Sequence, residues 1–458
     1  MRAPSWHHAG PTVLLAACIA GCGGSASEPS PPPPPPPPSP TPVVQALNPG
    51  NVALGTTRDL HVTGSGFEAG IKVEFTRTAV EPGLATTVLS VTAAEVVVRV
   101  VAAATIPIAV YNVVATNPSG KSGTGNRLLL VDQVAAYEQE APSGGGVVSI
   151  IRPTGAAVGA VGGGCQGASD FGVPVQWDEA GHLTPLSAPA SAGCSLFPLG
   201  EFGGSLYGRG IPSDGNASNS AVIWPAGGTA QVFKPAQPPF GIRYVFDGVT
   251  PQGLFLAHAV DAVPAVRRVP FTWSNASGWQ QFQMPAGFLS CFPGGTSPTG
   301  ELTAQCFDPG PDQAVYWTDA GAAPITLPLP PGYATGAALG INAAHVIVGV
   351  AFGAPFRALR WTPTGGGWTV ELLPDLGNGS GAGQINDAGW IAGGSGMDAD
   401  GRAVLWSPTG TIRTLSRLEA DHFCAATSIA ASTPTVPPVV GGRCLRQGAF
   451  RPVVWRPN

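Results

Sequence analysis

The stretch Phe356-Arg357-Ala358-Leu359-Arg360-Trp361-Thr362-Pro363-Thr364-Gly365 joins a β-rich run to a tryptophan and a short turn that ends in glycine. The same pattern recurs through the C-terminal part of the chain. Its tryptophans follow one another at intervals of 44 to 49 residues: Trp177, Trp224, Trp273, Trp317, Trp361, Trp406 and Trp455. Repeats of that length are typical of propeller blades. We therefore expect an all-β chain in which residues 133–458 form a seven-bladed β-propeller.

Each repeat contains enough short runs for four strands. In the sixth repeat, Gln384–Asn386 and Trp390–Gly394 flank a turn of small residues, a pattern typical of a hairpin. A third run ends at Trp406, and a fourth, Thr411–Leu415, follows Gly410. Four antiparallel strands make one blade. Because the repeated tryptophans recur at one place within strands, we interpret them as core residues rather than as a ring of stacking platforms for sugars.

Three further tryptophans fall outside the phase of the repeat. They are Trp279, Trp368 and Trp390. An aromatic side chain that repetition does not assign to the core is a better candidate for an exposed contact. We predict that these three residues, together with the long loops of repeats two, three and seven, are where a ligand would be contacted.

The last repeat predicts how the ring closes. It stops at Trp455, directly after its third strand, so a fourth strand is missing. A strand-like run, Val147–Pro153, precedes the first repeat and is not otherwise assigned. We predict that this N-terminal run pairs with the strand that ends at Trp455. Such a pairing would complete the last blade and remove an open sheet edge.

The hairpin phrase resembles a known repeat family. Gly340-Ile341-Asn342 leads to Val348-Gly349, and the turn of tryptophan, three residues and glycine follows. This order is similar to the HAF-type repeats of exported bacterial proteins. The resemblance is clear in repeats five and six and weaker toward the first and third. It implies a repeat architecture only, because that family has no agreed catalytic residues.

Residues 43–132 predict a separate domain. Seven short β-type runs, punctuated by Gly, Pro and Asn, are typical of an antiparallel β-sandwich. The phrases Leu47–Gly50, Leu60–Phe67 and Val113–Gly120 resemble the immunoglobulin-like IPT/TIG domain. The resemblance spans the whole segment. It implies a spacer or an interaction module, with no catalytic residues.

The N-terminus predicts export. Arg2 and the apolar run Thr12–Ile19 are typical of a signal peptide, here residues 1–21. Ile19-Ala20-Gly21-Cys22 resembles a bacterial lipobox, which implies lipid on Cys22, and Gly23 in place of Asp implies the outer membrane of a Gram-negative bacterium. Residues 22–42, with eight consecutive prolines, would be a semi-rigid tether. The alternative is an ordinary signal peptide that is cut elsewhere.

Cysteine spacing predicts disulfides. Six cysteines remain beyond Cys18 and Cys22, an even number in an exported chain. Repeat phase places a first-strand and a second-strand cysteine in the same blade twice, which predicts the pairs Cys291–Cys306 and Cys424–Cys444. Elimination leaves Cys165–Cys194 as a pair across neighbouring blades. The histidines are dispersed, so a zinc site is disfavoured.

Composition narrows the function further. The formal net charge is −5 and the 22 Lys and Arg residues are scattered, which argues against nucleic-acid binding. No nucleophile elbow, zinc-protease motif or complete phosphate loop occurs, and no cofactor is implied. We expect a monomeric, non-enzymatic binding or scaffold protein for an unidentified protein or polysaccharide. The alternative is an exported hydrolase or lyase that acts on an extracellular polymer at the propeller channel.

Overall fold

The computed structural model describes residues 38–141, 145–164, 167–213, 218–239, 241, 243–261, 267–396, 401–418, 423–446 and 448–457. The predicted signal peptide, Cys22 and most of the tether lie outside the described residues. Strands β1 to β36 and one 3₁₀ turn, η1 (Ala190–Ala192), form the regular structure of the described part. The expected all-β class is confirmed.

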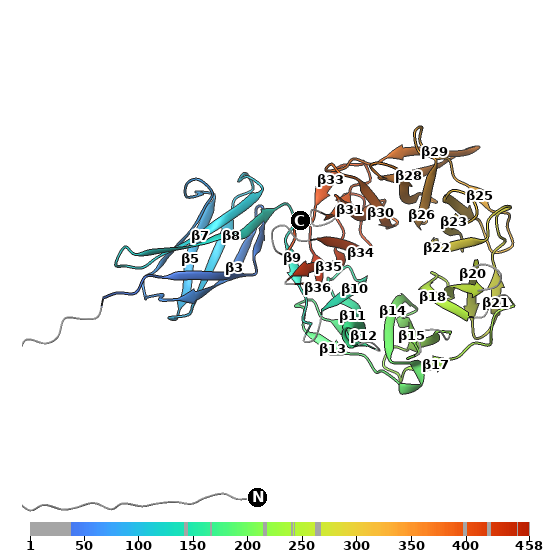
Figure 1. Cartoon of the computed structure of the whole chain (residues 1–458), viewed down its shortest axis with the longest axis horizontal. Helices are drawn as coiled ribbons and strands as arrows, with labels where there is room; N and C mark the ends of the chain where they lie inside the picture. The colour runs from blue at the N-terminus through green and yellow to red at the C-terminus, as the bar shows by residue number, and fades with distance from the viewer. Residues whose placement is uncertain are drawn as a thin grey trace, which may run out of the picture. The chain divides into compact units, whose positions relative to one another are not determined.

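The N-terminal domain consists of two four-stranded sheets (Figure 1). One sheet contains β1 (Val43–Asn48), β3 (Thr57–Ser65), β6 (Glu95–Ala102) and β5 (Leu84–Val91) in that order. The other contains β2 (Asn51–Ala53), β8 (Ser122–Asp132), β7 (Ala109–Thr116) and β4 (Lys72–Thr76). Strand β2, which pairs in parallel with β8, was not predicted.

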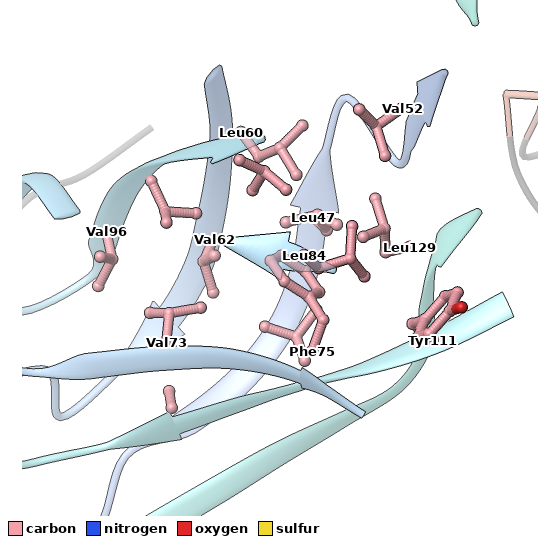
Figure 2. Packing of buried hydrophobic residues seen from close by; sticks show 14 of the residues in the cluster. Leu47, Val52, Leu60, Val62, Val73, Phe75, Leu84, Val96, Tyr111 and Leu129 are labelled. Carbon is pink, nitrogen blue, oxygen red and sulfur yellow. The ribbon is translucent and has the colours of Figure 1, made fainter. Parts of the chain in front are cut away.

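Alternating side chains build the core of this domain. In β6, Val96, Val98 and Val100 are fully buried, while the residues between them are partly or fully exposed. Side chains of successive strand residues point to opposite faces, so this alternation leaves one apolar face on each sheet. Figure 2 shows the two sets of side chains meeting, with Val62 and Val96 on one side and Phe75 on the other.

The C-terminal part is a β-propeller, with its sheets arranged around a ring (Figure 1). Within the described residues, five sheets have four strands and one has eight. The four-stranded sheets are β10 (Gly146–Ile151), β11 (Ala157–Gly164), β12 (Gly167–Trp177) and β13 (Leu183–Pro185); β14 (Ser195–Phe202), β15 (Ser205–Ile211), β16 (Ser220–Trp224) and β17 (Gln231–Phe233); β26 (Thr335–Ile341), β27 (Ile347–Phe352), β28 (Arg357–Thr364) and β29 (Gly367–Leu372); β30 (Ser380–Ile385), β31 (Ile391–Ser395), β32 (Arg402–Trp406) and β33 (Ile412–Thr414); and β34 (Cys424–Ile429), β35 (Val440–Arg446), β36 (Ala449–Trp455) and β9 (Ala136–Glu138).

The eight-stranded sheet joins two sets of four strands. It contains β18 (Arg243–Val249), β19 (Phe255–Asp261), β20 (Arg267–Ser274), β21 (Gly278–Gln281), β22 (Ser290–Thr296), β23 (Leu302–Phe307), β24 (Gln313–Trp317) and β25 (Ile325–Thr326). The two sets are connected by a single pair of residues, Arg268 and Ser290, on β20 and β22. In every set the first strand borders the centre of the ring and the fourth lies outside (Figure 1).

Glycines in some of the second strands explain how the tryptophan of that sheet fits. A Cβ atom on Gly393 would lie 2.1 Å from the carbonyl oxygen of Gly381 and 3.0 Å from the ring of Trp406. A Cβ atom on Gly442 would lie 2.2 Å from the carbonyl oxygen of Ala425 and 2.7 Å from the ring of Trp455. Because glycine has no Cβ, the first strand and the indole can both approach the second strand at this point.

The strand that closes the ring differs from the prediction. Strand β36 pairs with β9, where Trp455 is in register with Ala136. The predicted partner, the run from Val147, forms β10 instead and pairs with β11 as the innermost strand of the next sheet. An N-terminal strand does complete the last sheet, but the assignment of that strand to Val147–Pro153 was wrong. The first strand of a blade also has a strong β pattern, and this pattern misled the assignment.

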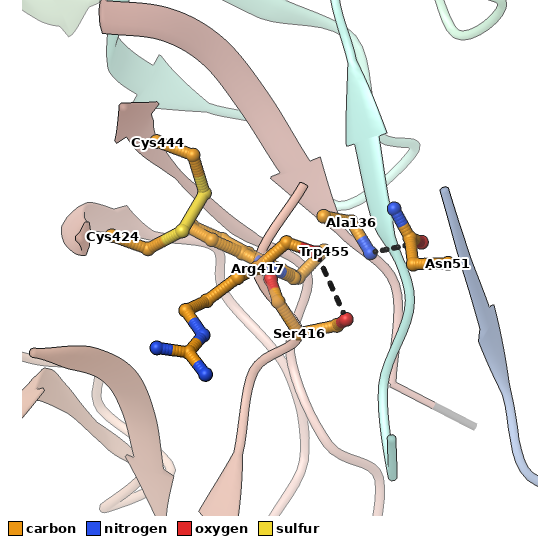
Figure 3. The surroundings of a disulfide bond; sticks show 7 residues. All are labelled: Asn51, Ala136, Ser416, Arg417, Cys424, Cys444 and Trp455. Atoms are coloured by element: carbon orange, nitrogen blue, oxygen red, sulfur yellow. Dashed lines mark hydrogen bonds between the residues drawn. A yellow bond between two sulfur atoms is a disulfide. The ribbon is translucent and has the colours of Figure 1, made fainter. Parts of the chain in front are cut away.

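The N-terminal domain holds the closing strand. The backbone N–H of Ala136 donates to Oδ1 of Asn51 at 3.1 Å (Figure 3). The guanidinium of Arg58 donates to the carbonyl oxygen of Ala136 at 3.2 Å. The same guanidinium lies 4.5 Å from the ring centroid of Tyr137. Burial lowers the pKa of Arg58 to about 10, so the side chain stays charged at neutral pH. Side chains of the sandwich thus satisfy both backbone groups of one residue of β9.

Candidate functional site

The repeated tryptophans connect neighbouring sheets. All seven are at most 6% exposed. The indole N–H of six of them donates, at 2.6 to 2.8 Å, to a carbonyl oxygen two residues beyond the fourth strand of the preceding set of four strands: Trp177 to Glu140, Trp224 to Ser187, Trp317 to Gln283, Trp361 to Pro328, Trp406 to Pro374 and Trp455 to Ser416. The last of these bonds is drawn in Figure 3. These rings cannot stack on a ligand without being pulled from the core.

The three tryptophans outside the repeat phase also make internal contacts. Trp390 is 3% exposed and donates to the carbonyl oxygen of Thr433 at 3.0 Å, so the expected exposure of its ring is not observed. Trp279 is half-buried and donates to the carbonyl oxygen of Ala236 at 2.8 Å. Trp368, also half-buried, packs edge-on against Tyr316. Among the described residues of this sheet, Trp279, rather than the repeated Trp273, donates an indole hydrogen bond to the preceding sheet.

Two of the three predicted disulfides are confirmed. Cys291 pairs with Cys306, and Cys424 pairs with Cys444. Each bridge joins the first and second strands of one sheet at residues in register. Figure 3 shows the second bridge beside Trp455. Cys194 is also disulfide-bonded, but Cys165 lies outside the described residues, so their pairing stays a prediction.

A cavity with a mixed polar and apolar lining is the strongest candidate for a binding site. Its volume is about 780 Å³, within the range of ligand pockets. Three loops form it: the one before β14, the one between β15 and β16, and the one between β17 and β18. The lining residues are Ala190, Ser191, Ala192, Gly193, Cys194, Pro212, Ser213, Ser218, Asn219, Ser220, Lys234, Pro235, Gln237 and Tyr244. We call this space the inter-sheet cavity.

Hydrogen bonds fix the wall of the inter-sheet cavity. Oγ of Ser218 accepts from Nε2 of Gln237 at 3.1 Å and from the backbone N–H of Tyr244 at 3.2 Å. Oδ1 of Asn219 accepts from the backbone N–H of Phe246 at 3.3 Å. The hydroxyl of Tyr244 donates to the carbonyl oxygen of Pro235, and burial raises the pKa of this phenol to about 12. These bonds hold Ser218, Asn219 and Tyr244 in place before any ligand arrives.

A second cavity adjoins the first. It measures about 420 Å³ and is lined by Val232, Phe233, Lys234, Pro235, Ala236, Trp273, Ser274, Asn275 and Gly278. Lys234 and Pro235 line both spaces. The segment after β17 thus separates two hollows on neighbouring sheets.

The most elaborate polar cluster lies elsewhere, around Glu301. This carboxylate, 4% exposed, accepts hydrogen bonds from Oγ of Ser297 at 2.6 Å and from the hydroxyls of Thr299 and Tyr316. Nδ1 of His345 lies 2.8 Å from both carboxylate oxygens. Burial alone would raise the pKa of Glu301, but the surrounding donors outweigh it and leave the pKa lowered.

The position of the Glu301 cluster indicates a structural role. Glu301 follows β22 and His345 follows β26, so the pair joins the first hairpin turns of adjacent strand sets. The next turns are joined in the same way, since Nδ2 of Asn342 donates to the carbonyl oxygen of Asn386 at 3.1 Å, and Nδ2 of Asn386 donates to that of Ala430 at 2.9 Å. A carboxylate and an imidazole here replace an amide that elsewhere makes the same connection.

A second carboxylate–imidazole pair borders the centre of the ring. Nδ1 of His258 lies 2.7 Å from Oδ2 of Asp247. Asp247 is the extra residue of a bulge in β18, between Phe246 and Gly248. His258 is 6% exposed and packs edge-on against Phe292. The contacts of this imidazole with Asp247 and Phe292 both lie within the eight-stranded sheet.

The described residues offer neither a group of metal ligands nor a membrane-spanning helix. No group of three or more His, Cys, Asp or Glu side chains there could hold a metal ion. No helix of the described part is long and apolar enough to cross a membrane.

Sequence reasoning did not find the inter-sheet cavity or the Glu301 cluster. Both are built from loops whose residues come from different repeats, and the repeat period gives no information on which loops meet. The one available signal was the expectation that the long loops of repeats two and three differ from the rest. The cavity does lie on those loops.

Comparison with known proteins adds little to the site. No protein-family model matches the sequence. Curated proteins likewise contain no sequence that matches it. Solved structures with a similar fold include YCF48 from Cyanidioschyzon merolae, with 11% identity and a TM-score of 0.45 over 70% of this chain and 99% of that one.

TolB from Acinetobacter baumannii is similar at 12% identity and a TM-score of 0.37, over 65% of this chain and 78% of that one. Puromycin hydrolase is similar at 15% identity and a TM-score of 0.46, over 69% of this chain and 52% of that one. At such identities and scores these similarities assign neither a family nor an activity, and the function has to be inferred from the chain's own residues.

Proposed function

We propose that this protein is an exported binding module that holds a polysaccharide in the inter-sheet cavity without transforming it. The observation that carries the proposal is the chemistry of the cavity lining. Side-chain hydroxyls of four serines, the amides of Asn219 and Gln237 and the amine of Lys234 surround the space. Hydroxyl and amide groups both donate and accept hydrogen bonds, which suits the hydroxyl groups of sugars.

The same lining gives no support for catalysis. Among its described residues there is no histidine, aspartate or glutamate that could act as a general acid or base. Cys194 is disulfide-bonded and therefore offers no thiolate nucleophile. A bound polymer would be retained, and the alternative of an exported hydrolase or lyase has no support from the residues at this cavity.

The rest of the chain fits a role at the cell envelope. Lipid on Cys22 would attach the protein to the outer membrane, and the Pro-rich tether would hold it away from the lipid. Residues 43–132 would serve as an immunoglobulin-like spacer. We also infer that the propeller has seven blades, since the eight-stranded sheet divides into two blades at the single contact of Arg268 with Ser290. The protein would act as a monomer, with no nucleic acid as partner.

Binding of the mature protein to an immobilised panel of bacterial and plant polysaccharides tests the proposal. Ser191 is an exposed residue of the cavity lining, so Ser191→Trp should block the site. Thr364→Trp, at an exposed turn of another sheet, is the matched control and should bind as the unchanged protein does. Binding that survives Ser191→Trp, or capture of envelope proteins in place of glycans, would refute the proposal.

Chromatography of the recovered glycans tests the absence of turnover. Unchanged chain lengths after prolonged incubation are expected. Shortened or unsaturated products that disappear with Ser191→Trp would instead identify an enzyme.

A further inference from the structure

Lysine is distributed unevenly in this protein. The sequence contains 19 arginines but only three lysines: Lys72, Lys121 and Lys234. The first two belong to the N-terminal domain. Lys234 is therefore the only lysine in residues 133–458. The side chain also has no hydrogen bond or ion pair with any residue that the structure describes, whereas Lys72 pairs with Glu74 at 2.6 Å.

Lys234 is placed where its amine can contact a ligand in either of two cavities. It is an exposed residue directly after β17, where it lines both the inter-sheet cavity and the adjoining cavity. No carboxylate of the described residues lines either space. A flexible, compact ammonium can meet an anionic group from either cavity without the fixed geometry that a guanidinium requires.

We propose that the ligand is an acidic polysaccharide whose anionic group, a carboxylate or a sulfate, pairs with Lys234 while neighbouring sugars occupy the two cavities. The proposal rests on the glycan-binding function above and adds the charge of the ligand. A neutral polysaccharide would still bind, but it would leave the ammonium without a partner. The charge of Lys234 therefore makes the site prefer acidic over neutral polysaccharides. The two hollows on either side of Lys234 favour an extended chain over a single sugar unit.

Matched ligands test the charge. Oligogalacturonate, its fully methyl-esterified form and a sulfated galactan are titrated against the mature protein at low and at physiological salt. Oligogalacturonate should bind on the order of fivefold more tightly than the ester, with the difference reduced at higher salt. Stronger binding of the sulfated galactan would assign sulfate as the anionic group. Equal affinity for the acid and its ester would overturn the inference while leaving glycan binding intact.

Variants at Lys234 test the residue. Lys234→Met keeps the length of the side chain and should abolish the preference for the acid over the ester, while Lys234→Arg should keep it. Lys121→Met, in the N-terminal domain, is the control and should behave as the unchanged protein. A preference that survives Lys234→Met would overturn the inference. Failure of every glycan to bind would overturn the proposed function as well.

Carbodiimide coupling gives a readout that does not depend on affinity. It joins a bound carboxylate to an adjacent amine as an amide, and the chain has only three lysine side chains to react. Mass spectrometry of peptides should find galacturonate on Lys234, with coupling suppressed by excess unlabelled ligand. Coupling spread evenly over Lys72, Lys121 and Lys234 would contradict a specific contact.

Discussion

Gly393 shows what a single residue contributes to the propeller. We predict that Gly393→Ala lowers the free energy of unfolding by about 1–3 kcal/mol, because the added methyl group would collide with the carbonyl oxygen of Gly381 and the ring of Trp406. Gly381→Ala is the control, since nothing lies within 4 Å of its added Cβ. Chemical denaturation of both variants is the measurement. Equal losses would mean that close approach is not the reason for glycine at position 393.

Glu301 should make stability depend on pH. Burial opposes ionisation, but donors from Ser297, Tyr316 and His345 leave the pKa of this carboxyl below its ordinary value of 4.5. A group with a lowered folded-state pKa stabilises the fold above its unfolded-state pKa, and the contribution is lost as pH falls through the folded-state value. Thermal unfolding of Glu301→Gln should therefore be less sensitive to pH below about 4.5 than that of the unchanged protein. Parallel curves would contradict this.

At the scale of elements, the closing strand depends on the neighbouring domain. Asn51 is fully buried and accepts the N–H of Ala136 in β9. We predict that Asn51→Ala destabilises the fold by about 1–3 kcal/mol, because a buried backbone donor loses its partner. Hydrogen exchange should show faster exchange at Ala136 although the substitution lies in the sandwich. Asp59→Ala, which removes an exposed pair with Arg99, should leave that exchange unchanged.

The disulfide elements allow a separate prediction. Cys424 and Cys444 enclose a loop of about 20 residues in the last sheet. Replacing both by serine should lower the free energy of unfolding by roughly 3 kcal/mol through the greater freedom of the unfolded chain. Denaturation under oxidising conditions measures the loss. An unaffected midpoint would mean that the bridge does not restrict the unfolded state.

Strands and disulfides that are marked by a repeated residue pattern could be predicted from the sequence. The spacing of the tryptophans placed the third strands, and the phase of the cysteines gave two bridges, because both patterns repeat within one sheet. Strand β9 could not be found in this way. It has only three residues, Ala136-Tyr137-Glu138, and its backbone is held by Asn51 and Arg58 far away in the sequence. The run Val147–Ile151 is longer and has a stronger β pattern, which favoured it as the closing strand. It instead forms β10, the first strand of the next sheet.

At the scale of the whole molecule, the proposed anchoring in the membrane depends on the sulfur atom of Cys22. Cys22→Ser removes the thiol that would carry the lipid. We predict that this variant loses incorporation of labelled palmitate and moves from the membrane fraction to the soluble exported fraction. Cys18→Ser, within the apolar run, is the control and should remain in the membrane. Membrane retention of Cys22→Ser would contradict lipid anchoring.

Candidate binding residues were beyond the reach of the sequence for a related reason. Ser191, Ser218 and Lys234 come from loops of different sheets, and nothing in their local sequence indicates that they surround one cavity. The three tryptophans predicted to contact a ligand, Trp279, Trp368 and Trp390, make contacts inside the protein instead. Composition did contain one unused signal, the presence of a single lysine after residue 132.

The pairing of Trp455 with Ala136 also sets an order of events. The two residues are about 320 positions apart, so β9 is synthesised long before β36. During that interval the edge of β9 that pairs with β36 has no partner, and closing so long a loop is slow. A neighbouring chain that arrives in the same state can supply the missing strand instead. High expression should therefore favour strand-exchanged dimers, because Asn51 and Arg58 bind the edge of β9 that faces away from β36 and leave the pairing edge open.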